Sequence, residues 1–104
     1  MPKVAQRSAD FEVWQGDSLI GTLWDVRGDH PWSVGRFVPG RGWAAVSPLF
    51  AAQEEWRQQS FSEGMVWAVV GVRRLGVELR PVRGGESIRP GKIFLAKDRA
   101  SFRD

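Results

Sequence analysis

The amino-acid sequence predicts an α+β domain, in which one or two helices pack on one face of a small antiparallel β-sheet of four or five strands. Strand-like runs separated by glycine-containing turns occur both early and late in the chain, as in antiparallel hairpins. Between them lie one or two segments whose apolar residues recur at helical spacing. Strands that precede and follow the helices are therefore expected to join in a single sheet.

The chain has 104 residues, of which 42% are hydrophobic and 26% are charged, as is typical of one globular domain. Residues 1–9 are small or polar without periodicity, and we expect them to be a flexible tail before a single domain over residues 10–104. There are six tryptophans, and each can bury ~150–250 Å². We therefore expect tryptophans from distant parts of the chain to form much of the core.

Two strands are predicted at residues 10–15 and 18–26, joined by the two-residue turn Gly16-Asp17. Strand side chains alternate between faces, so one face of this hairpin is expected to be core. The residues predicted to share that core face are Phe11, Val13, Ile20, Thr22 and Trp24. Trp14 and Leu19 would share the opposite face, where they are a candidate contact for a homodimer.

Residues 32–38 are expected to form a short strand with Val34 or Phe37 pointing inward, and a glycine-rich turn follows at residues 40–42. Ser47-Pro48 predicts a helix start, because serine caps a free amide and proline fits the first helical position. The helix should cover residues 48–59, with Glu54 and Arg57 paired on its solvent side. The residues expected to face the sheet are Leu49, Ala52 and Trp56.

Residues 65–76 are compatible with a strand or a helix, and we favour a helix that ends at Leu75-Gly76. A strand is expected at residues 77–83, followed by a turn at Gly84-Gly85. The returning strand should cover residues 86–97, with an interruption at residues 89–92. Its end, Ile93, Phe94 and Leu95, is expected to lie in the core.

The composition excludes several chemistries. The chain has no cysteine and one histidine, which rules out disulfides, thiolate metal sites and histidine-based metal clusters. The glycine-rich turns match no phosphate-binding motif, so we expect neither a cofactor nor a metal. The most apolar stretch, residues 65–72, has about eight residues, whereas a membrane span needs ~20. No secretory signal is recognised at the start of the chain, and we expect a cytoplasmic protein without a membrane partner.

Residues 27–43 combine aromatic and arginine side chains in one irregular segment. The candidate partner-binding residues are Trp32, Arg36, Arg41 and Trp43. Tryptophan and arginine are the residue types that most often dominate protein interfaces. A scaffold interpretation stays open, in which the prolines and glycines bend the segment so that its tryptophans cap the core. The leading functional hypothesis is a small non-enzymatic module that binds another, unidentified protein.

Two further hypotheses come from charged residues. Residues 73–104 hold nine basic and four acidic side chains, which suggests a nucleic-acid or other anionic partner as an alternative to a merely solvated surface. The candidate anion-binding residues are Arg73, Arg74, Arg80, Arg83 and Arg89. A second alternative is a small enzyme with Asp25 or Asp29 as a carboxylate base, which would require a pocket that raises the pKa of that carboxylate.

The chain also resembles a family of small uncharacterised bacterial proteins. The family pattern is similar to Pro-Trp-x-x-Gly-x-Phe-x-Pro, then Pro-Leu-Phe before a helix, then Leu-Gly-x-x-Leu and Gly-Gly-x-x-Ile. The first of these begins here at Pro31-Trp32, and the others begin at Pro48, Leu75 and Gly84. The resemblance covers residues 11–103. Family members often end in an aromatic residue followed by Phe-Arg, whereas this chain has Ser101 before Phe102-Arg103. It implies domain limits and no activity.

Overall fold

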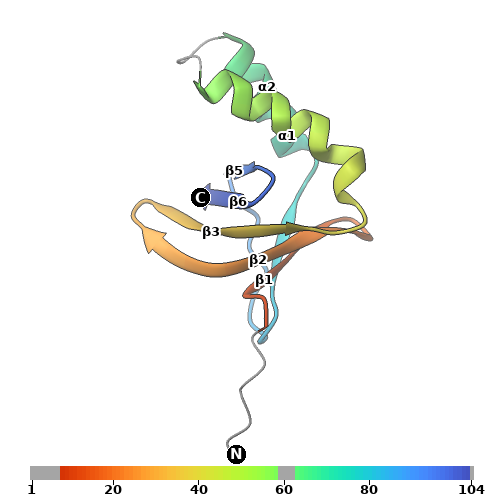
Figure 1. Ribbon diagram of the computed structural model, residues 1–104, viewed down its shortest axis with the longest axis vertical. Coiled ribbons are helices and arrows are strands. Elements are labelled where there is room, and N and C mark those ends of the chain that lie inside the picture. Colours follow the sequence, from red (N-terminus) through yellow and green to blue (C-terminus); the bar gives the residue numbers. More distant parts are fainter. Residues whose placement is uncertain (1–7, 59–62, 104) are drawn as a thin grey trace, which may run out of the picture.

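The computed structural model describes residues 8–58 and 63–103, without the side chains of residues 56, 58 and 63–65. It confirms an α+β fold with an antiparallel sheet and two helices, and the sheet has six strands rather than four or five. The strands are ordered β4-β1-β2-β3-β6-β5 across a curled sheet, and the helices lie together on one side of it (Figure 1). The elements are β1 (Phe11–Gln15), β2 (Ser18–Asp29), β3 (Trp32–Pro39), α1 (Trp43–Gln58), α2 (Glu63–Arg74), β4 (Glu78–Pro81), β5 (Lys92–Leu95) and β6 (Arg99–Arg103).

The first hairpin forms as predicted, but its core face is different. Gly16 takes a φ of 56° in the turn between β1 and β2, a conformation that glycine adopts without steric cost. Trp14 then pairs with Leu19 and Val13 with Gly21, so Ile20 is an extra residue in a β-bulge. The bulge shifts the alternation of β2. Ile20 and Leu23 are buried, whereas the Thr22 and Trp24 side chains predicted for the core lie outside it.

Strands β2 and β3 form a long hairpin with a second bulge. Trp24 pairs with Arg36 and Arg27 with Val34, so Asp25 and Val26 together oppose Gly35. Asp25 adopts a φ of 55° there. A β-carbon on Gly35 would lie 2.8 Å from the carbonyl oxygen of Trp24, so the bulge requires glycine at this position. Phe37 on β3 is buried, which confirms one of the two inward residues predicted for this strand.

Helix α1 begins at Trp43, five residues before the predicted start, and Pro48 lies inside it. A proline inside a helix leaves the carbonyl four residues earlier, here that of Ala44, without its usual N–H donor. The Ser47 hydroxyl donates a hydrogen bond to this carbonyl oxygen at 3.4 Å. The Ser47-Pro48 pair is therefore accommodated within the helix, and the prediction that it starts the helix is wrong.

The buried face of α1 is also rotated relative to the prediction. Val46, Phe50 and Gln53 are buried, while Leu49 packs at the margin of the core and Ala52 is half-buried. The predicted ion pair between Glu54 and Arg57 is confirmed, with 3.6 Å between Oε2 and Nη1. The Trp56 side chain and residue 59 of the predicted helix lie outside the described residues.

The second helix, favoured over a strand for residues 65–76, is confirmed as α2. The helix ends at Arg74, just before the predicted Leu75-Gly76, and Gly76 has a φ of 67° and donates its N–H to the carbonyl of Arg73 at 3.1 Å. Gly71 faces α1 so closely that a β-carbon there would lie 3.1 Å from Leu49. Within the described ranges, no helix is both long enough and apolar enough to cross a membrane.

The last third of the chain departs most from the prediction. Gly84 and Gly85 form the predicted turn, with φ values of 90° and 118°. The returning segment, however, pairs with β4 only at the single bridge between Leu79 and Ile88. It then crosses to the opposite edge of the sheet, where β5 pairs with β6, a strand that the sequence did not predict. Ile93, Phe94 and Leu95 are buried as expected.

The core is aliphatic and phenylalanine-rich, so the expectation of a tryptophan core is wrong for the described side chains. Its fully buried members include Phe50, Leu23 and Leu79, and the buried set contains no tryptophan among the residues described. Trp43 comes nearest, packed against Phe37 and Phe50 with ring centroids 4.8 Å and 5.5 Å away. At the start of the domain, Ala9 is buried, while residues 1–7 of the predicted tail lie outside the described residues.

Candidate functional site

An apolar groove lies where α2 and the end of α1 meet the β5 edge of the sheet. It has a volume of about 340 Å³. Its lining comprises Trp32, Arg57, Val66, Val69, Val70, Lys92 and Phe94. The three valines come from α2 at helical spacing and form one wall, while Phe94 and Lys92 belong to β5. Apolar side chains with a few charged groups at the margin are typical of a binding site.

Four side chains form a continuous row of contacts beside this groove, in which the planes of the Trp32 and Phe94 rings are tilted by 54° to one another. The Arg57 guanidinium lies 4.6 Å from the Phe94 ring centroid, and the Phe94 and Trp32 centroids are 5.7 Å apart. On the other side, the Arg103 guanidinium lies 5.6 Å from the Trp32 ring. The cations are attracted to the electron-rich ring faces, which fixes the aromatic side chains in place. An arginine therefore covers a ring at each end of this row.

The margin of the groove is basic. Arg57 forms an ion pair with Glu54 on the same helix. Lys92 and Arg103 form no ion pair with any other residue in the described part of the chain. The adjoining surface of α2 is apolar, because Val66 and Trp67 are 46% and 67% exposed. An apolar surface with a basic margin favours a ligand that is apolar and carries negative charge.

A second hollow of about 560 Å³ lies on the outer face of β2, β3 and β6, the face opposite the core. Arg36 and Arg99 are directly opposite one another on β3 and β6, and both line this hollow with Arg27. Asp25 forms an ion pair with Arg36 at 3.3 Å, and Asp98 lines the same hollow. Like charges directly opposite across two strands destabilise a sheet, and the ion pair of Arg36 with Asp25 offsets part of the repulsion between Arg36 and Arg99.

The four residues predicted to contact a partner do not share one hollow. Trp32 lines the apolar groove, and Arg36 lines the hollow on the outer sheet face. Arg41 is exposed beside Trp14 and Leu19, in a hollow of about 580 Å³. Trp43 packs against the core and borders a fourth hollow beside α1. Of the four predicted contact residues, Trp32 is the one that lines the groove. Trp43 agrees with the alternative interpretation, in which the tryptophans of this segment cap the core.

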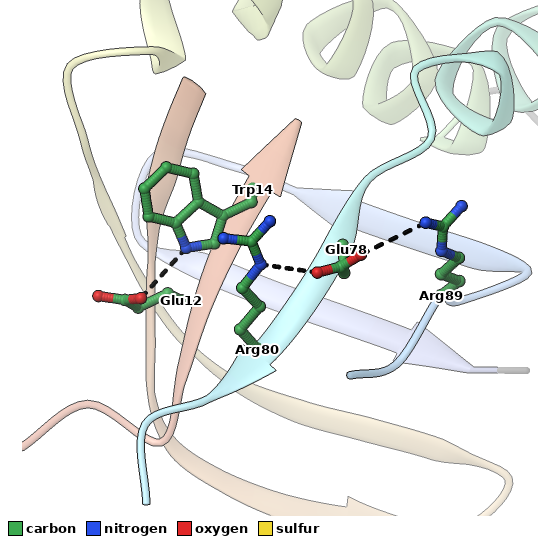
Figure 2. A network of polar contacts seen from close by, with 5 residues as sticks. All are labelled: Glu12, Trp14, Glu78, Arg80 and Arg89. Carbon is green, nitrogen blue, oxygen red and sulfur yellow. Dashed lines mark hydrogen bonds and ion pairs between the residues drawn. The ribbon is translucent and has the colours of Figure 1, made fainter. Parts of the chain in front are cut away.

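The five arginines predicted to bind anions are also dispersed. Arg80 and Arg89 both pair with Glu78, at 2.6 Å and 3.4 Å, and Figure 2 shows this carboxylate between the two guanidinium groups. Arg80 also lies over the ring of Trp14, whose indole N–H donates to Glu12 at 3.1 Å. Arg73 and Arg74 are exposed at the end of α2, and Arg83 is exposed in the turn after β4.

Glu78 is the residue at the centre of this network. The hydrogen bond from Arg80 lowers the pKa of the Glu78 carboxyl below its usual value, against a smaller opposing effect of burial, and the charges of Arg80 and Arg89 lower it further. The carboxylate is therefore ionised at neutral pH and holds β4 to the segment that contains Arg89. This part of the predicted anion site is already neutralised by the protein itself.

The predicted carboxylate bases are both on the surface. Asp25 pairs with Arg36 in the bulge of β2, and Asp29 is exposed at the end of that strand. Within the ranges that the structure describes, no three histidine, aspartate or glutamate side chains come together as a metal site would require. Trp14 and Leu19, the candidate homodimer contact, are cross-strand partners and half-buried, and the homodimer stays a prediction.

Sequence reasoning missed most of the groove. Arg57, Val66, Phe94 and Arg103 belong to four different elements, and their meeting depends on β6 and on the crossing of the chain to β5. One signal was available: Val66, Val69 and Val70 recur at helical spacing, and a helix with one apolar face needs a neighbour. A scan against protein-family models finds no match, and searches of curated proteins and of solved structures find no similar protein.

Proposed function

We propose that this protein is an interaction module that binds another protein by taking an apolar side chain of that partner into the groove between α2 and β5. The observation that carries the proposal is the groove itself, lined by Val66, Val69 and Val70 next to the packed rings of Phe94 and Trp32. Apolar clusters with aromatic and arginine neighbours are characteristic of the energetic centres of protein interfaces.

The neighbouring surface extends the apolar area beyond the groove. Val66 and Trp67 are exposed on α2, next to the valines that line it. A contiguous apolar surface on a small domain is typical of an interaction site. Because Lys92, Arg103 and Arg57 surround it, a partner segment with carboxylates beside its apolar residue fits best.

The same geometry argues against stacked nucleic-acid bases at this site. Single-stranded nucleic acids bind by stacking bases on open aromatic faces. Here Arg57 covers the Phe94 ring, Arg103 covers the Trp32 ring, and the two rings pack on each other. A base would have to displace an arginine that the ring already binds, so a protein partner is the better fit.

The test uses an array of short peptides that carry one leucine among acidic, neutral or basic residues. Leucine-containing acidic peptides are expected to bind the wild-type protein, and Val66→Glu is expected to weaken this binding about tenfold or more. Val82→Glu is the matched control, since Val82 is similarly exposed at 43% and lies in the turn after β4. Equal binding by leucine-free peptides, or no loss with Val66→Glu, contradicts the proposal. Salt-sensitive binding of oligodeoxythymidylate with no peptide binding would instead favour the nucleic-acid alternative.

A further inference from the structure

The groove and the arginine hollow lie on the same face of the sheet, one beyond the other. On β3 the side chains of Trp32, Val34 and Arg36 alternate with those of the core, and on β6 Arg99 and Ser101 are the pairing partners of Arg36 and Val34. Trp32 contacts the groove, and Arg36 and Arg99 line the hollow. The path along β3 and β6 from one hollow to the other is short, because Val34 of the arginine hollow and Phe94 of the groove both flank Ser101.

Val34 and Ser101 lie between the two ends of this path. They are cross-strand partners, and Ser101 is buried, so a bound segment would lie above it rather than against it. Trp32 and Arg36 are four residues apart on one strand, which corresponds to a distance of roughly 13 Å at ~3.3 Å per residue. An extended peptide spans the same distance in about four residues.

The side chains along the path are mainly basic. The basic side chains around the two hollows outnumber the acidic ones six to three. The basic ones are Arg27, Arg36, Arg57, Lys92, Arg99 and Arg103, and the acidic ones are Asp25, Glu54 and Asp98. Among the described residues, Arg27 and Arg99 form no ion pair, and both line the hollow that Arg36 also lines.

We infer that the partner of the groove is an extended, acidic protein segment that places an apolar residue in the groove and a carboxylate between Arg36 and Arg99, about four residues along. This inference rests on the proposed function and specifies its partner. Asp25 offsets part of the Arg36 charge, and a carboxylate between the two arginines offsets more of their repulsion by accepting charge-assisted hydrogen bonds from Arg99 and Arg36. The arginine pair is thereby a second anchor, which sets the direction and register of the bound segment.

The experiment varies the distance between the two anchors. Labelled peptides carry one leucine and one pair of glutamates separated by zero to about eight glycine or serine residues, and fluorescence anisotropy measures their affinity. Binding is expected to be tightest at a separation of about four residues. The variant Arg36→Gln/Arg99→Gln is expected to remove this preference and to weaken the best peptide about tenfold, while the dependence on leucine persists.

The matched control is Arg74→Gln/Arg83→Gln, which removes two exposed arginines outside both hollows. It is expected to preserve the spacing preference, and thermal unfolding checks that both double variants are folded. Affinity that is independent of spacing, or equal losses in the two double variants, overturns the inference and leaves the groove intact. Affinity that is independent of the leucine overturns the proposed function instead. Oligodeoxythymidylate could also bind as tightly as the best peptide, with this binding lost in Arg36→Gln/Arg99→Gln. That result would show that the two arginines bind nucleic acid, and it would overturn the inference.

Discussion

The side-chain amide of Gln53 donates a hydrogen bond of 2.7 Å to the carbonyl oxygen of Ile93, and Gln53 is only 1% exposed. Strand β5 is an edge of the sheet, so some of its carbonyl groups have no neighbouring strand. Gln53 thus satisfies an edge carbonyl from α1 and fixes the helix against β5. The groove depends on this arrangement, because Arg57 lies one turn further along the same helix.

Replacing Gln53 with methionine retains most of the side-chain volume but removes the donor. The Ile93 carbonyl then stays buried without a partner, and the free energy of unfolding is expected to fall by about 1–3 kcal/mol. Urea unfolding monitored by circular dichroism measures the loss. Glu55→Met, at an exposed position of the same helix, is expected to change stability by less than about 0.5 kcal/mol. Equal effects of the two variants would show that the hydrogen bond is unimportant.

Two glycines of β2 are expected to respond differently to alanine. A β-carbon on Gly21 would lie 2.5 Å from both the Val38 carbonyl oxygen and the Phe37 ring, whereas one on Gly28 would meet nothing within 4 Å. Gly21→Ala should therefore cost about 1–3 kcal/mol through overpacking. Gly28→Ala should be neutral or slightly stabilising, because it restricts the unfolded chain. Chemical denaturation measures the free energy of unfolding of both variants. An unchanged stability of Gly21→Ala would contradict the close packing of β2 on β3.

The position of Pro48 inside α1 predicts that Pro48→Ala stabilises the protein. Alanine supplies the N–H that the Ala44 carbonyl lacks and removes a clash, and a gain of about 1–3 kcal/mol is expected. If the helix began at Pro48, the same change would have almost no effect. The thermal unfolding midpoint distinguishes the two cases. As a control, Ser47→Ala should cost less in the Pro48→Ala background, since the Ala44 carbonyl then has a backbone donor.

The lowered pKa of Glu78 predicts a pH-dependent contribution to stability. A carboxyl whose pKa is lower in the folded state stabilises the fold above its unfolded pKa of about 4.5, and this contribution is lost as the pH falls through the folded pKa. Glu78→Gln should therefore be less stable than the wild type at pH 7, and the difference should shrink as the pH is lowered from 7 to about 2. Urea titrations at the two pH values measure it. Glu86→Gln, in the exposed loop after β4, serves as the control, and a Glu78→Gln difference that does not shrink over this pH range would exclude ionisation as its source.

The local parts of the fold could be predicted from the sequence. Gly16-Asp17 and Gly84-Gly85 mark turns because glycine adopts their positive φ values without steric cost, and Gly76 follows the end of α2 for the same reason. The side chains facing the core were predicted less well. A single extra residue at Ile20 inverts the alternation of β2, and no local pattern distinguishes such a bulge from a regular strand.

The candidate site was largely beyond sequence reasoning because its residues meet only through long-range pairing. Trp32 was selected for its residue type, but its partners Phe94 and Arg103 follow from the pairing of β3, β6 and β5. Strand β6 was missed because arginine, alanine and serine are weak strand formers. The prediction of an anion-binding arginine cluster overlooked Glu78, whose carboxylate forms ion pairs with Arg80 and Arg89.

The place of β6 between β3 and β5 has a consequence for synthesis on the ribosome. Residues 11–39 can form their hairpins as soon as they emerge, since β1, β2 and β3 are neighbours both in the chain and in the sheet. Strand β5 joins the sheet only through β6, which is translated after it. Until residues 99–103 are free to pair, Ile93 and Leu95 cannot take their places in the core, and the groove that Phe94 lines cannot form.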